Sequence, residues 1–206
     1  MVNFQTCKAM KKIMFNDKYK LTYAVLMRMK TMTRRLVPES VVIDGKIWAL
    51  TQNKDPQEAL REYILSKAPY KVGEIVAISQ SYRQVEMEID GQGLPLNIKE
   101  EIRRHRGYKN KMYVKAEDMP HKIKITDLKL AFIQEISDED CIKEGIYALT
   151  DDNSNRKPKT EYTYIGGRIF DKPQWAFRSL FIKTSRKRKE WEQNWWTYAY
   201  EFELVD

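Results

Sequence analysis

Lysine and arginine side chains gather in three segments of this 206-residue chain. Basic residues outnumber acidic ones by seven in residues 1–40, by five in 99–124 and by four in 183–190, whereas acidic residues outnumber basic ones by six in 125–155. Clustered cations bind phosphate groups, so the pattern predicts a phosphate-bearing ligand. A solvated, highly charged surface is the alternative interpretation of the same runs.

The cysteines and histidines form neither a disulfide pattern nor a metal-binding pattern. Cys7 and Cys141 are the only cysteines, lie far apart in the sequence and belong to no C-x-x-C motif. His105 and His121 do not supply a zinc ligand set by themselves. We therefore expect neither a metal nor another cofactor.

The composition is typical of a folded domain. Hydrophobic residues make up 42% of the chain, which is enough for a substantial core at this length. The apolar stretches, such as Tyr23–Met27 and Ile75–Ile78, are far shorter than the roughly 20 residues of a membrane-spanning helix. The segment Met1–Phe15 also lacks the features of a secretory signal. We expect a single cytoplasmic domain that spans residues 1–206.

Hydrophobic spacing and capping residues predict short helices among several strands. The expected helices cover residues 18–30, 55–67, 137–145 and 174–183. The expected strands are a hairpin over 41–50 that turns at Asp44-Gly45, and segments 75–79, 112–115, 122–136 and 196–204. Residues 86–112 and 150–172 are predicted to be loops. This pattern indicates an α+β fold with a small, mostly antiparallel sheet or barrel.

Five segments, in order along the chain, resemble motifs of the ASCH domain family, whose small domains are related in fold to the PUA RNA-binding barrel. The segment Met29–Arg35 (MKTMTRR) is similar to the family signature K-T-x-T-[RI]-R. The other four are Pro69–Glu74, Met119–Ile125, Ile136–Gly145 and the pair Trp191–Trp196 with Tyr200–Phe202. The resemblance is strongest to phage-type members and covers most of the chain.

The resemblance implies a small PUA-like β-barrel with peripheral short helices, inserted loops and a binding cleft. For one bacterial branch it implies hydrolysis of N4-acetylated cytidine by a lysine, a threonine three residues later and a distant glutamate. By motif position these catalytic residues are Lys30, Thr33 and Glu144. The residues expected to bind substrate or nucleic acid are Thr31, Arg34, Arg35 and Tyr82.

These residue types suit the implied chemistry. A threonine hydroxyl needs a base to become a nucleophile, and Lys30 can serve if burial or the neighbouring Arg34 and Arg35 lower its pKa. A continuing helix would place Lys30 and Thr33 on one face, and a tight turn would also bring them together. Glu144 could orient the lysine or protonate the departing amine. A nearby carboxylate, however, favours the ammonium form of Lys30, which opposes a role as base.

Structural roles are the alternatives for the same residues. Lys30 and the two arginines could bind phosphate without catalysis. Thr33 could bond to the backbone in a turn, and Glu144 could be a helix-end residue paired with a base. The aromatic residues Trp191, Trp195 and Trp196 are expected to be core residues rather than platforms for base stacking.

The chain also departs from the family pattern. Arg28 stands where the family has glycine, so a left-handed turn there would be costly and the approach to Lys30 could differ. The segment Ile78–Gln80 lacks a carboxylate that relatives carry. The chain is about twice as long as the amidohydrolase branch, with insertions expected near 44–68, 86–111 and 150–190.

We therefore expect a protein that binds a nucleoside, nucleotide or RNA in a barrel cleft, through basic segments 1–40, 99–124 and 183–189. Hydrolysis of an N-acylated cytidine is the first functional hypothesis. A non-catalytic RNA-binding module of a phage or prophage is the second. A host-takeover protein that acts on a protein partner is a third, for which no specific motif is present.

Overall fold

The computed structural model of the chain describes residues 9–89, 96–151 and 159–205. It divides into two compact units. Unit 1, the smaller, is drawn from Met1–Phe15, Glu74–Lys124 and Leu204–Asp206. Unit 2 is drawn from Asn16–Gly73 and Ile125–Glu203. No helix in the described part of the chain combines the length and the apolar character needed to cross a bilayer.

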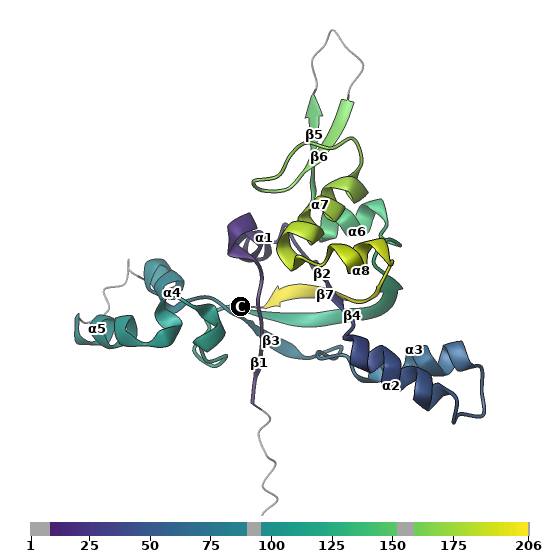
Figure 1. The fold of residues 1–206 in the computed structure, drawn as a ribbon. Coiled ribbons are helices and arrows are strands. Elements are labelled where there is room, and N and C mark those ends of the chain that lie inside the picture. The colour runs from purple at the N-terminus through teal and green to yellow at the C-terminus, as the bar shows by residue number, and fades with distance from the viewer. Residues whose placement is uncertain (1–8, 90–95, 152–158, 206) are drawn as a thin grey trace, which may run out of the picture. The chain divides into compact units, whose positions relative to one another are not determined.

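Both units contain helices and strands (Figure 1). The strands are β1 (Lys11–Ile13), β2 (Met32–Leu36), β3 (Ile75–Ile78), β4 (Lys122–Phe132), β5 (Tyr147–Asp151), β6 (Lys159–Thr163) and β7 (Trp196–Val205). The α-helices are α1 (Leu21–Leu26), α2 (Glu39–Ala49), α3 (Pro56–Ser66), α4 (Tyr82–Ile89), α5 (Leu96–Arg104), α6 (Asp138–Lys143), α7 (Pro173–Ser185) and α8 (Arg188–Glu192). Short 3-10 helices are η1 (Asp17–Tyr19), η3 (Arg106–Tyr108) and η4 (Lys111–Tyr113).

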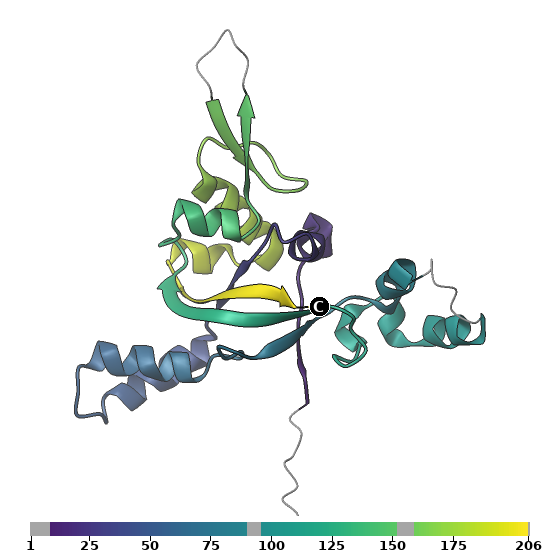
Figure 2. The same cartoon turned by 180° about the vertical axis from the view of Figure 1, so that it is seen from behind.

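The main sheet has five strands in the order β1-β3-β4-β7-β2 and is mostly antiparallel. The exception is β1, which pairs with β3 in parallel. In this order β1 and β2 are edge strands, so these five strands form an open sheet rather than a closed barrel. The α+β class and the antiparallel character are as the sequence predicts. A second sheet consists of the hairpin β5-β6, which projects from the rest of unit 2 (Figure 2).

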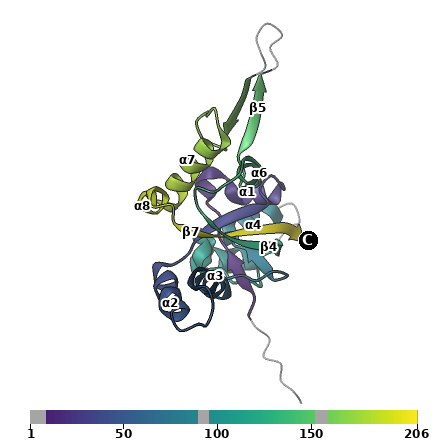
Figure 3. The ribbon, with the colours of Figure 1, turned by 90° about the vertical axis from the view of Figure 1, so that its right-hand side faces the viewer.

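In unit 2, the paired strands β2 and β7 lie between two helical layers (Figure 3). Successive side chains of a strand leave opposite faces of the sheet. Arg34 of β2 reaches Asp140 of α6 on one face. On the other face the Tyr198 hydroxyl of β7 donates to the Ile64 carbonyl of α3. The sheet is therefore covered by α6 and α7 on one side and by α3 on the other.

The core of unit 2 is aromatic and lies where α6, α7 and α8 meet. Phe177, Phe181 and Trp191 pack there with ring centroids 5.8–6.2 Å apart. Trp195 donates its indole N–H to the Val37 carbonyl, and Trp196 stacks on Phe132 at 3.8 Å. The three tryptophans near the C-terminus are thus packing residues, as their sequence pattern indicates.

The predicted helix caps are confirmed at two sites. The Asp55 carboxylate accepts hydrogen bonds from the backbone N–H groups of Gln57 and Glu58 and begins α3. The Ser137 hydroxyl accepts from the N–H of Asp140 and begins α6. The strands expected at 75–79, 122–136 and 196–204 and the helix expected at 174–183 also form, with ends shifted by a few residues.

Replacing Asp55 with alanine is expected to lower the free energy of unfolding by about 1 kcal/mol, because two N–H groups of α3 lose their acceptor. Asp55→Asn keeps a side-chain oxygen and should retain most of the stability. Denaturant unfolding followed by tryptophan fluorescence measures both, since all five tryptophans lie in unit 2. Equal losses in the two variants would show that the cap does not stabilise α3.

The hairpin predicted over 41–50 is wrong, because this segment is the helix α2. Gly45 is buried in the helix where α2 packs against α3. A Cβ at this position would lie 2.8 Å from Leu60 Cδ1 and 3.0 Å from Tyr63 Cδ1. The glycine therefore permits a close approach of two helices rather than a turn between two strands.

Four other predicted segments differ from the structure. Within 86–112, expected as a loop, α5 and two 3-10 helices form, although Gly91 and Gly93 lie outside the described residues. Residues 112–115 are not a strand, because the Asn110 side chain accepts from the Met112 N–H and starts η4 instead. The segment 150–172 contributes to the hairpin β5-β6 on both sides of residues 152–158, which are not described. The helix expected over 18–30 is only α1.

Candidate functional site

Lys30 lies at the end of the turn that follows α1 and just before β2. Arg28 adopts a left-handed conformation with φ of 57°, a geometry that favours glycine. The N–H groups of Met29 and Lys30 both donate to the Ala24 carbonyl, at 2.8 and 3.0 Å. This wrapped helix end directs the chain into the sheet, and the Lys30 residue is only 2% exposed.

Glu144 lies at the end of α6, next to Lys30. Gly145 follows with φ of 97°, a conformation that ends the helix and favours glycine. The Thr31 N–H donates to the Lys143 carbonyl at 2.9 Å, which joins the start of β2 to the end of α6. Glu144 is 4% exposed. Two helix ends, 114 residues apart in sequence, thus place one lysine and one glutamate together.

Four charged side chains, three buried and Asp140 half-buried, form a network that we call the Lys30 cluster: Lys30, Arg34, Asp140 and Glu144. Lys30 Nζ donates to Glu144 Oε2 at 2.6 Å and to the Glu144 carbonyl at 2.7 Å. Arg34 Nη2 lies 2.6 Å from Asp140 Oδ2, and Arg34 Nη1 lies 3.8 Å from Glu144 Oε1. The Arg34 guanidinium also lies 5.9 Å from the centre of the Phe177 ring.

Two polar atoms of the cluster are buried without a hydrogen-bond partner among the described residues. They are Glu144 Oε1, an acceptor, and Arg34 Nε, a donor. A buried polar group without a partner costs about 1–3 kcal/mol, so such atoms are rare in folded proteins. The two atoms belong to residues that already contact each other, since Arg34 Nη1 lies 3.8 Å from Glu144 Oε1.

Burial lowers the pKa of Lys30, because the ammonium loses its hydration. The Glu144 carboxylate opposes this shift, and the charges of Arg35 and Arg34 add to it. Burial also lowers the pKa of Arg35, against the effects of Tyr70, Glu144 and Tyr200. Lys30 is therefore easier to deprotonate than an ordinary lysine, which is the condition that its proposed role as a base requires.

Thr33 lies in β2, 5% exposed, and pairs in register with Tyr200 of β7. Its hydroxyl makes no hydrogen bond to Lys30 or Glu144 within the described ranges. Of the two ways to bring Lys30 and Thr33 together, the continuing helix does not form, since Thr33 belongs to a strand. Thr33 and Arg35 are two residues apart in β2, so their side chains leave the same face of the sheet. The charge of Arg35 lowers the pKa of Lys30.

The remaining predicted binding residues have different locations. Thr31 bonds through its backbone to Lys143 and Phe202. Arg34 belongs to the Lys30 cluster, and Arg35 pairs in register with Tyr198. Tyr82 lies in unit 1, where it borders a hollow of about 350 Å³ and its hydroxyl donates to Asp118 at 2.5 Å. Burial raises the pKa of Tyr82.

Sequence reasoning missed Asp140 as a partner of the basic motif. The sequence placed this residue only within the helix expected over 137–145. A signal was present, because Asp140 and Glu144 are four residues apart and so share one face of α6. Two carboxylates on one helix face favour two cations opposite, which here are Lys30 and Arg34.

Cys141 lies between these two carboxylates in sequence and is fully buried. Burial raises the pKa of its thiol to about 12, so the thiol stays protonated at pH 8. In a Cys7→Ser variant, which leaves Cys141 as the only cysteine, we expect no reaction with a thiol reagent at pH 8 until denaturant is added. Rapid labelling of the native protein would show that the end of α6 opens readily.

Comparisons with known proteins provide no neighbour for this chain: no protein-family model, no curated protein and no solved structure matches it. Among the described residues, no group of three or more histidine, cysteine, aspartate and glutamate side chains is arranged to hold a metal ion. A functional assignment therefore rests on the geometry of the Lys30 cluster and on the sequence resemblance.

Proposed function

We propose that the chain is an ASCH-type protein with a PUA-like fold that hydrolyses the acyl amide of an N-acylated cytidine at the Lys30 cluster. The observation that carries the proposal is the buried contact of Lys30 with Glu144 at 2.6 Å, in an environment that lowers the lysine pKa. Burying a lysine beside a carboxylate costs free energy, because both charges lose their hydration. Side chains with shifted pKa values concentrate at functional sites.

The proposed reaction begins when the neutral Lys30 amine accepts the proton of the Thr33 hydroxyl. Thr33 Oγ1 then attacks the acyl carbon, the amide C–N bond breaks, and the ring amine leaves with a proton delivered through Lys30 or Glu144. Water hydrolyses the resulting threonyl ester to a carboxylic acid and restores the hydroxyl. In the proposed complex, substrate binding brings the Thr33 hydroxyl within reach of Lys30.

The partnerless Glu144 Oε1 and Arg34 Nε suit a cytosine-like ligand. An acylated cytosine presents an amide N–H donor and carbonyl acceptors within one planar group. The carboxylate oxygen can accept the N–H, and the guanidinium N–H can donate to a carbonyl oxygen. An amide substrate carries both kinds of group, whereas a fully ionised phosphate has no donor for the Glu144 oxygen.

Incubation of the purified protein with N4-acetylcytidine tests the proposal. We expect release of cytidine and acetate, which chromatography measures, at a rate well above that of the buffer alone. Acetylated lysine peptides serve as a control amide and should not react, because they lack the planar ring. Binding of N4-acetylcytidine without product would contradict the enzymatic proposal and would favour a binding module.

A further inference from the structure

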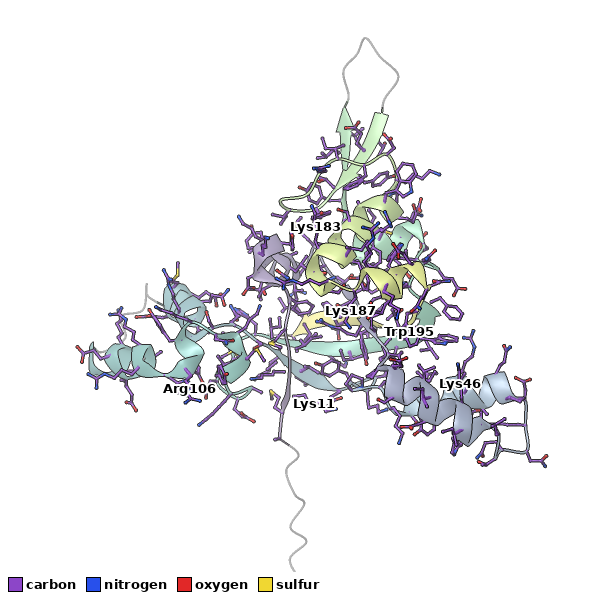
Figure 4. All side chains as sticks on the ribbon, in the orientation of Figure 1. Lys11, Lys46, Arg106, Lys183, Lys187 and Trp195 are labelled. Atoms are coloured by element: carbon purple, nitrogen blue, oxygen red, sulfur yellow. The ribbon has the colours of Figure 1, made fainter. Side chains whose placement is uncertain are left out.

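A second concave surface lies in unit 2, built from α7, α8 and the segment after β6. It encloses a hollow of about 640 Å³, within the size range of small-molecule sites. Its lining residues are Arg168, Phe170, Trp175, Arg178, Ser179, Ile182, Lys183 and Arg188. We call it the α7 hollow. Figure 4 labels one of its residues, Lys183, on α7.

One face of α7 lines the hollow and the opposite face packs in the core. Arg178 and Ser179 lie three and four residues after Trp175, and Ile182 lies four and three residues after them, so the four residues share one face of the helix. The opposite face carries the buried residues Ala176, Phe177, Leu180 and Phe181. Because the core holds α7 in this orientation, the lining side chains are presented on a rigid element.

The rest of the wall is also fixed by contacts within unit 2. Phe170 exchanges two backbone hydrogen bonds with Tyr162 of β6, at 2.8 and 2.9 Å. These bonds hold the segment that carries Arg168. Arg188 begins α8 and forms a surface ion pair with Glu192 at 2.9 Å. The wall of the hollow is thus formed by α7, α8 and the segment after β6, rather than by a single helix.

The α7 hollow is strongly basic. Four of its lining residues are Arg168, Arg178, Lys183 and Arg188, and no acidic side chain lines it in the described part of the chain. Neither Arg168 nor Arg178 forms an ion pair with any described residue. Concave basic surfaces focus positive potential and attract anions. Arg178 and Arg168 therefore have charge available for an anionic ligand.

An aromatic residue accompanies these cations. Trp175 is 53% exposed, although a tryptophan is costly to leave in water. Lys172 lies 5.7 Å from the centre of its ring. An exposed indole beside several cations is the combination that binds single-stranded nucleic acids, since bases stack on the ring while phosphates contact the cations.

We propose that the α7 hollow binds single-stranded nucleic acid, with phosphates on Arg168, Arg178 and Lys183 and a base on Trp175. A duplex keeps its bases stacked on each other, so it cannot use Trp175 in this way. Free phosphate would use the cations but not the ring. The inference is independent of amide hydrolysis at the Lys30 cluster, because the two surfaces share no residue.

Fluorescence anisotropy with a labelled twelve-nucleotide oligouridylate tests the inference over a series of salt concentrations. In the double variant Arg178→Ala/Lys183→Ala we expect affinity to fall about tenfold or more at low salt. The slope of log affinity against log salt should also shrink by about 1.4, because each contact on a single strand contributes about 0.7. The matched control Arg83→Ala/Lys46→Ala removes the same two residue types from exposed positions outside the hollow. Figure 4 also labels Lys46, on α2.

Trp175→Ala provides the second readout. It should weaken binding of the single strand by about fivefold to 150-fold. It should leave the salt slope unchanged, because it removes stacking and no charge. Affinity for an RNA duplex of the same length, and for inorganic phosphate, should not change in this variant.

Three results would overturn the inference. The wild-type protein could fail to bind the oligonucleotide at low salt. The control double variant could lose as much affinity as Arg178→Ala/Lys183→Ala, which would assign binding to net charge. Trp175→Ala could bind as tightly as the wild type. Turnover of N4-acetylcytidine is measured separately, so failure here and failure of the proposed hydrolysis are distinguishable.

Discussion

Glu144→Ala is expected to lower the free energy of unfolding by about 3–5 kcal/mol, because it leaves the Lys30 ammonium buried without its carboxylate. The partner variant Lys30→Met should also destabilise, since it leaves the Glu144 carboxylate with only the more distant Arg34. Both effects concern a pair with almost no exposure to solvent. Denaturant unfolding followed by tryptophan fluorescence reports on unit 2, which contains the whole pair.

The double variant Lys30→Met/Glu144→Leu distinguishes the stability that comes from the ion pair from the stability that comes from side-chain packing. It removes both charges, so its cost should be clearly smaller than the sum of the two single costs. The surface pair Arg188–Glu192 provides a matched control, and Glu192→Ala should cost less than about 0.5 kcal/mol. Additive costs for the Lys30 and Glu144 variants would contradict a coupled buried pair.

The pH dependence of the free energy of unfolding of Glu144→Gln shows in which direction the folded protein shifts the pKa of Lys30. Without the carboxylate, the folded-state pKa of Lys30 should fall further below that of the unfolded chain. The unfolded state then binds more protons between the two pKa values, so stability should rise with pH across that window, up to the ordinary lysine pKa. The rise should be larger in Glu144→Gln than in the wild type. Identical pH profiles would mean that Glu144 does not control the charge of Lys30.

The second large effect concerns catalysis, and it rests on the proposed hydrolysis. Lys30→Met is expected to reduce kcat/KM for N4-acetylcytidine by about 10²- to 10⁴-fold, the usual contribution of a positioned general base. Lys129→Met is the matched control, since Lys129 forms surface ion pairs with Asp127 and Glu201. The control should retain the wild-type rate.

The pH–rate profile tests the role of Lys30 as the base. A base acts in its deprotonated form, so kcat/KM should fall as the pH drops through the Lys30 pKa. Because burial lowers that pKa, this limb should lie at a lower pH than that of an ordinary lysine. A rate that is flat with pH, or a Lys30→Met variant that retains activity, would assign Lys30 to structure alone.

Local features of the fold were predictable because a single residue and its neighbours determine them. Asp55 before Pro56, and Ser137 before an acidic turn, give helix starts that need no tertiary information. Asp44-Gly45 misled the prediction, because the same dipeptide suits a tight turn and a close helix contact. Only the position of Leu60 and Tyr63 distinguishes the two.

The candidate site was predictable only in part. The sequence resemblance named Lys30 and Glu144, and the structure brings them into direct contact. Spacing alone could not have paired residues 114 positions apart. The sequence left open whether a continuing helix or a tight turn joins Lys30 and Thr33. In the structure the left-handed Arg28 ends the turn after α1, and β2 begins before Thr33. The α7 hollow was not predicted, because Arg168 and Trp175 lie outside the charge runs that drew attention to residues 183–189.

The most direct test of the Lys30 cluster as an active site is the initial rate of cytidine release from N4-acetylcytidine by the wild type and by Thr33→Val. Valine preserves the shape of threonine and removes the hydroxyl, while Thr126→Val makes the same change at an exposed position of β4. The account predicts release by the wild type and by Thr126→Val, and a rate no higher than that of buffer for Thr33→Val. Equal release by the wild type and Thr33→Val, or none by the wild type, would contradict it.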